Sequence, residues 1–82
     1  MYNVNELREE LVFVMREMHD DAITGINVVD DIADVLCSYY DDVIASGDAA
    51  LETCYRSVTE LAGEDPREQA TALEIAIAEL TK

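Results

Sequence analysis

Apolar residues recur along this chain at intervals of three and four positions, which is the spacing of amphipathic helices. Four stretches show the pattern, and none alternates with the two-residue period of a strand. The pattern predicts an all-α fold, a compact bundle of four helices at residues 4–22, 28–46, 49–62 and 66–81. A chain of 82 residues suits one small domain, so we expect a single acidic helical domain over residues 1–82.

Capping residues separate the four predicted helices. Side chains that commonly begin helices stand before each of them, and a glycine follows each of the first three. The predicted N-caps are Asn3, Asn27, Asp48 and Asp65, and the predicted ends are Gly25, Gly47 and Gly63. Asp65 also precedes Pro66 at the first helical position, which strengthens the start of the last helix.

The apolar face of each predicted helix defines the expected core. Its tyrosines and methionines are expected to pack rather than to contact a ligand. We expect Cys37 and Cys54 to be buried free thiols, because both fall on apolar faces. The expected core comprises Val4, Leu7, Leu11, Val14, Met15, Met18, Val29, Ile32, Ala33, Leu36, Tyr40, Val43, Ile44, Ala50, Leu51, Cys54, Val58, Leu61, Ala70, Leu73, Ala76, Ile77 and Leu80.

The charge balance narrows the classes of partner. Nineteen acidic residues face five basic ones, which gives a net charge of −14. Between Arg16 and Arg56 the chain has ten acidic residues and no Lys or Arg. Such a field repels nucleic acid and anionic membranes and attracts basic proteins or divalent metals. Without a membrane span, a signal peptide or a phosphate loop, we expect a cytoplasmic protein with no cofactor.

The predicted helix at 28–46 carries five aspartates on its outer face. Asp30, Asp34 and Asp41 form one row, and Asp31 and Asp42 form a second. Aspartate is a poor helix former, by up to ~0.7 kcal/mol against alanine. Asp30 and Asp31 interact favourably with the helix N-terminus, whereas Asp34, Asp41 and Asp42 are expected to lie beyond it. The last three therefore have no evident role in folding.

Their spacing suggests a role in binding. Residues 30–42 span ~18 Å of helix, which gives about one carboxylate per 4 Å. A single DNA strand carries one phosphate per ~3.4 Å. We therefore predict a small inhibitor that occupies the basic, nucleic-acid-binding surface of a partner by mimicking DNA or RNA. In size and charge the chain resembles small phage inhibitors of host defence, including anti-restriction and anti-CRISPR proteins.

Phe13 is a second candidate contact. On a helical wheel it lies in the middle of a charged face of the first helix, near Glu17 and Asp20. An aromatic residue surrounded by charge is typical of a contact site. Ile75 is a weaker case on the last helix. A different hypothesis is that the chain is a structural oligomerising module, with Phe13 and Ile75 marking a homodimer surface.

An enzyme hypothesis comes from a family resemblance. The stretches EELVF at 9–13 and DDIADVLCSYYDDVIASGDAALE at 30–52 resemble the MazG-type all-α nucleotide pyrophosphohydrolases. In that family, carboxylates on two successive helices bind magnesium at the substrate phosphates. The resemblance assigns Glu9 and Glu10 to the first motif, and Asp31 and Asp34 to the second. Phe13 stands where the family has a third carboxylate of the first motif, which implies either an altered site or a catalytically inactive relative.

Overall fold

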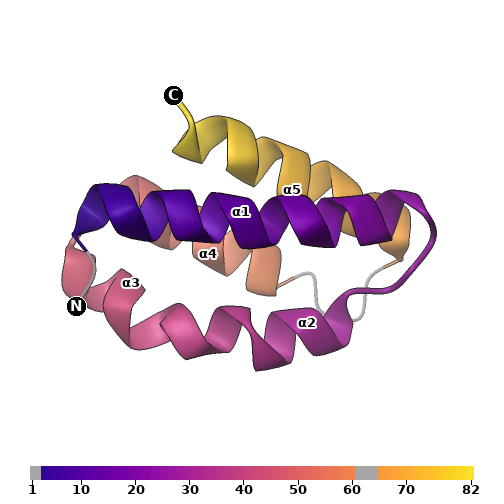
Figure 1. Ribbon diagram of the computed structural model, residues 1–82, viewed down its shortest axis with the longest axis horizontal. Coiled ribbons are helices and arrows are strands. Elements are labelled where there is room, and N and C mark those ends of the chain that lie inside the picture. The colour runs from indigo at the N-terminus through magenta and orange to yellow at the C-terminus, as the bar shows by residue number, and fades with distance from the viewer. Residues whose placement is uncertain (1–2, 61–64) are drawn as a thin grey trace.

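The computed structural model describes residues 3–60 and 65–82, apart from the side chain of Ala33 (Figure 1). The described residues form helices and no strand, which confirms the all-α prediction. The elements are α1 (Val4–Ile23), α2 (Val29–Asp34), a 3₁₀ helix η1 (Leu36–Tyr39), α3 (Tyr40–Ser46), α4 (Ala49–Thr59) and α5 (Pro66–Leu80). The four expected helices are therefore present, with the second divided into three pieces.

Helix α1 is central to the arrangement. In Figure 1 it lies between α5 on one side and the segment α2–η1–α3 on the other. Both α1 and α4 pack extensively against α5, and α3 contacts both α1 and α4. The segment at 29–46 thus has one side against the core and one side facing solvent, which is where the predicted aspartates lie.

The predicted N-caps are confirmed for α1, α4 and α5, whereas α2 begins at Val29 with Val28 as its N-cap, one residue later than predicted. All four predicted side chains still accept a hydrogen bond from a backbone N–H two or three residues further on. The pairs are Asn3 with Glu6, Asn27 with Val29, Asp48 with Leu51, and Asp65 with both Arg67 and Glu68. Gly47 ends α3 at a φ of 68°, a left-handed conformation that favours glycine. The predicted end at Gly63 lies outside the described residues.

Most of the expected core is buried around one cluster. Val12, Ala22, Val28, Tyr55 and Gln69 are also buried, which the helical wheels did not predict. The prediction is wrong for Tyr40, Ile44 and Ala50, which are exposed. Val4, Val14, Val29 and Ile77 are half-buried. The predictions for Leu61 and for the Ala33 side chain fall outside what the structure describes.

The break in the second helix corrects the predicted continuous helix at 28–46. The backbone N–H of Tyr40 bonds to the carbonyl of Cys37, three residues back instead of four. Except for Leu36, residues 35–40 are weaker helix formers than alanine or leucine, and the Ser38 hydroxyl donates to the Val35 carbonyl within the same turn. The buried Tyr55 hydroxyl donates to the Leu36 carbonyl at 2.8 Å. A hydrogen bond from α4 therefore holds this turn in place.

The 3₁₀ turn also explains the exposed residues. A 3₁₀ helix turns by about 120° per residue, against about 100° for an α-helix. Over the four residues of η1, the difference rotates α3 by about 80° relative to the expected helix. Tyr40 and Ile44 consequently face outward, while Val35 and Tyr39 pack against the core. Ala50 has a simpler reason, since it lies beside Leu51 in the first turn of α4 and points away from the core.

Gln69 joins α5 to the start of α2 from a buried position, with 1% of its surface exposed. Its Oε1 accepts a hydrogen bond from the Val28 backbone N–H at 3.1 Å, and its Nε2 donates to Asn27 Oδ1 at 3.0 Å. The Val28 N–H has no acceptor inside the helix that it precedes. Gln69 therefore caps α2 from a distant part of the chain.

Replacing Gln69 by leucine is expected to lower the free energy of unfolding by about 1–3 kcal/mol, because the Val28 N–H stays buried and loses its acceptor. Urea denaturation measures the change, with Thr71→Leu on the exposed side of α5 as the matched control. Hydrogen exchange should accelerate at the Val28 amide in the Gln69 variant alone. Equal urea midpoints for wild type and Gln69→Leu would contradict the capping role.

Candidate partner-binding surface

Five aspartates lie together on the segment at 29–46, three on α2 and two on α3. Three of them are exposed and two are half-buried. Among the described residues, none of the five lies within ion-pair distance of a Lys, Arg or His side chain. We call this set the aspartate face; its members are Asp30, Asp31, Asp34, Asp41 and Asp42.

The basic side chains of the protein lie on other elements. Arg8 and Arg16 are on α1, Arg56 is on α4, and Arg67 and Lys82 belong to α5 and the residues after it. Three of them pair with acids elsewhere: Arg8 with Asp48, Arg56 with Glu52, and Lys82 with Glu79. The 29–46 segment therefore carries five acidic side chains and no basic one, while α1 carries six acidic side chains together with Arg8 and Arg16.

The pair between Arg8 and Asp48 has a structural role. Asp48 begins α4, and its carboxylate accepts the Leu51 backbone N–H at 2.9 Å. This hydrogen bond, together with the Arg8 guanidinium, holds the pKa of Asp48 below its usual value. The pair links α1 to the start of α4, so neither charge is available for a partner.

The break in the second helix changes the explanation of two aspartates. Asp41 and Asp42 were expected near the C-terminal end of a long helix, whereas they lie in the first turn of α3. The N-terminal end of a helix favours negative charge, as it does for Asp30 and Asp31 in the first turn of α2, although at α3 the Tyr40 N–H is already bonded to the Cys37 carbonyl of η1. Asp34 is the last residue of α2, at the end that disfavours negative charge. Asp34 is thus the one member of the face without a local role.

The break in the second helix leaves the average spacing of the aspartates along the segment nearly unchanged. The aspartates do not, however, form the two straight rows that were expected. The two rows were expected on one continuous helix, and η1 rotates α3 relative to α2. A 3₁₀ helix rises by about 2.0 Å per residue, so residues 30–42 span about 20 Å. The face still carries about one carboxylate per 4 Å, which remains close to the ~3.4 Å of phosphates along a DNA strand.

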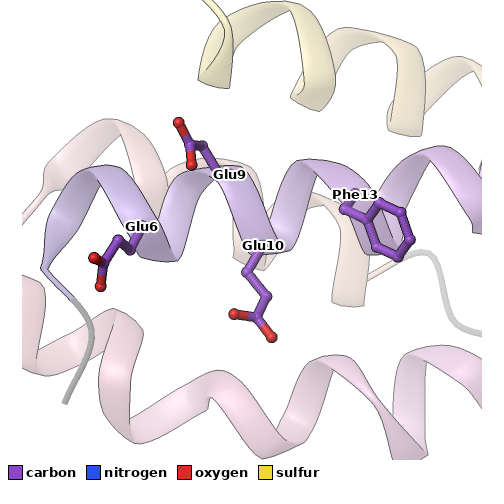
Figure 2. A pocket seen from close by; sticks show the side chains of 4 residues that line it. All are labelled: Glu6, Glu9, Glu10 and Phe13. Carbon is purple, nitrogen blue, oxygen red and sulfur yellow. The ribbon is translucent and has the colours of Figure 1, made fainter.

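Phe13 projects from α1 with 64% of its surface exposed. It lines an open hollow of about 450 Å³ with Glu6, Glu9 and Glu10 (Figure 2). Figure 2 shows Glu9 on the side of α5 and Glu10 on the side of the 29–46 segment. Glu10 accepts a hydrogen bond from the Tyr39 hydroxyl at 3.2 Å, which ties the edge of this hollow to η1. The exposed ring thus has carboxylates on one side, and it also lines a second hollow that holds Arg8, Arg16 and Lys82.

The other predicted contact residues are dispersed. Glu17 and Asp20 are exposed further along α1. Ile75 is 62% exposed but lines a separate hollow between α4 and α5, so it does not share a surface with Phe13. Sequence reasoning missed the exposed Ile23 and Ile26 at the turn between α1 and α2. Their position on either side of the predicted turn at Gly25 was the available signal.

Within the described residues, the other titratable groups do not come together in a second site. His19 Nε2 lies 3.2 Å from Glu74 Oε1, an ion pair only when the histidine is protonated. Both cysteines are free, as expected. Cys54 is buried, and burial raises the pKa of its thiol. The prediction is wrong for Cys37, which is exposed because it lies in the rotated 3₁₀ turn.

No metal centre is visible in the described part of the chain. Within residues 3–60 and 65–82, no three His, Cys, Asp or Glu side chains come together as a group that could hold a metal ion. Glu9, Glu10, Asp31 and Asp34, which the pyrophosphohydrolase motifs would bring together, do not form such a group. None of the described helices combines the length and the apolarity needed to cross a membrane.

Comparison with known proteins gives no relative. The chain matches no family model, no curated protein and no solved structure.

Proposed function

We propose that this protein is a non-enzymatic inhibitor that binds a basic protein surface which normally receives nucleic acid. The supporting observation is the aspartate face, which is accessible to solvent and lacks counter-charges within the described residues. A partner with exposed Lys and Arg side chains would supply the counter-charges that these carboxylates lack. The chain itself would not bind nucleic acid or an anionic membrane, because its net charge of −14 repels both.

The chemistry of aspartate suits this role. Its carboxylate is separated from the backbone by one methylene, so a helix holds it more firmly than the longer glutamate. Carboxylates that are already positioned lose less conformational entropy when a partner binds. Complementary charge also accelerates encounter, since opposite fields steer two proteins together. A face of positioned aspartates therefore supplies both rapid association and a fixed pattern of negative charge.

The surface around Phe13 is proposed as a second contact. An exposed aromatic ring beside Glu6, Glu9 and Glu10 offers apolar area that a basic partner can bury beneath its own Lys and Arg side chains. Glu17 and Asp20 extend the same helix with further exposed charge. This combination supports an inhibitor of the type that phages direct against host defence systems, whose targets handle nucleic acid.

Displacement of labelled nucleic acid from purified basic proteins tests the proposal. The protein should release the oligonucleotide, and its apparent affinity should fall at least about tenfold when the salt concentration rises from roughly 50 to 200 mM. Screening weakens the attraction between exposed opposite charges, which is the reason for this dependence. A failure to displace at low salt, or displacement that salt does not change, would count against the proposed function.

A further inference from the structure

A strip of exposed side chains crosses the junction of η1 and α3. Tyr40 is 51% exposed and Ile44 is 44% exposed, and the exposed Cys37 lies one turn before Tyr40. Their spacing of three and four residues places them along one outer face of the helical segment. We call these three residues the tyrosine strip. The exposed Asp34 precedes the strip in the chain, and the exposed Asp41 comes between Tyr40 and Ile44.

The bundle does not cover this strip. The 3₁₀ turn directs Val35, Tyr39 and Val43 toward the core instead, and these residues complete the packing of the segment. The Tyr40 ring lies with its centroid 6.2 Å from that of buried Tyr55, at a tilt of 53°. Tyr40 is therefore supported from beneath by a fixed ring while its outer side remains open.

We propose that the tyrosine strip inserts into a basic protein groove that normally holds single-stranded nucleic acid. This inference rests on the proposed function and names the class of partner. Grooves for single strands combine positive charge along the backbone path with aromatic side chains on which the bases stack. Duplex-binding surfaces instead contact phosphates and the edges of paired bases.

The arrangement of the strip favours the single-stranded class. Tyr40 is followed directly by Asp41 in the chain, so an exposed ring and a carboxylate succeed one another as a base and a phosphate do along a single strand. Ile44 adds exposed apolar area one turn after Tyr40. The whole segment from 29 to 46 contains no basic side chain that would repel the groove. A mimic of duplex DNA needs the carboxylates alone, whereas this face presents a ring among them.

Two purified proteins serve as probes in the test. One is a single-stranded-DNA-binding OB-fold protein loaded with fluorescent oligothymidylate, and the other is a helix-turn-helix protein loaded with a labelled duplex of equal length. The chain should displace the oligothymidylate. The double variant Tyr40→Ser/Ile44→Ser should be about tenfold weaker, because a lost stacking contact has that effect. Tyr40→Phe should retain the wild-type potency.

Ile75→Ser is the matched control, because Ile75 is similarly exposed but lies on α5. Its potency should equal that of the wild type. Circular dichroism verifies that the double variant keeps its helices, which is expected because both replaced side chains are exposed.

The possible outcomes separate this inference from the proposed function. If the double variant retains full potency, or if only the duplex is displaced, the inference is overturned while the proposed function stands. Displacement from neither probe at low salt would overturn both. Analytical sedimentation tests whether the strip is instead a dimer contact. A wild-type dimer that becomes a monomer in the double variant would assign the strip to a second copy of the chain, and would also overturn the inference.

Discussion

Replacing Asp34, Asp41 and Asp42 together by lysine is expected to abolish displacement of nucleic acid from a basic partner. All three carboxylates lie on the aspartate face, and no described Lys, Arg or His pairs with them. An exposed charge contact contributes up to about 1 kcal/mol, so losing three should weaken binding by about 100-fold. Lysine also repels the partner, so the measured loss should be at least that large. Fluorescence displacement at low salt measures it.

A control for net charge accompanies this variant. Replacing Glu60, Glu74 and Glu79 by lysine changes the charge by the same amount, since each reversal adds two charges, but does so after α4 and on α5. That control should retain most of the binding if the position of the charge matters. An equal loss of binding in the two triple variants would show that binding depends on net charge alone and not on the position of the aspartates. If neither variant loses binding and Phe13→Asp dissolves a dimer, the oligomerising-module hypothesis replaces the proposed function.

Alkaline pH is expected to destabilise the protein through Tyr55. Burial, and then the neighbouring Cys37 and Tyr40, raise the pKa of Tyr55 from 10.0 to about 12. Between these two pH values the unfolded chain releases the Tyr55 proton while the folded protein retains it, so stability falls as pH rises. A shift of this size corresponds to a loss of roughly 3 kcal/mol across that interval. Urea denaturation at pH values from 8 to about 12 measures the decline.

Tyr55→Phe isolates this contribution. The variant lacks the titrating hydroxyl, so the difference in stability from wild type should shrink as pH rises from 10 to about 12. At neutral pH the variant should be less stable by about 1 kcal/mol, because the Leu36 carbonyl loses its hydrogen bond from Tyr55. Tyr40→Phe removes only the last-ranked cause of the raised Tyr55 pKa, so its pH curve should stay close to that of wild type. Parallel pH curves for wild type and Tyr55→Phe would contradict the assignment.

The candidate surface was only partly visible in the sequence. The run of aspartates without basic residues can be read directly from residues 29–46. That these carboxylates have no described counter-charge depends on the fold, since Arg8 reaches Asp48 forty positions away. The exposure of Tyr40 and Ile44 was predicted wrongly, because a helical wheel assumes one uniform rotation along the helix. The 3₁₀ turn breaks that assumption.

Local chemistry determined the helices of this protein. The caps at Asn3, Asp48 and Asp65 act on N–H groups within three residues, so the sequence alone placed the helix starts. The spacing of apolar residues likewise placed most of the core, because burial favours a continuous apolar face. These signals involve neighbours along the chain and need no knowledge of distant elements.

Contacts between residues far apart in the chain determined the features that the local sequence did not. The Tyr55 hydroxyl bonds to the Leu36 carbonyl nineteen positions earlier, at the turn that divides the second helix. Gln69 caps α2 from forty-one positions beyond Val28. Buried polar groups must find hydrogen-bond partners, and the fold chooses which ones lie within reach. Tertiary structure thereby set the orientation of α3, and with it which aspartates and which aromatic ring face solvent.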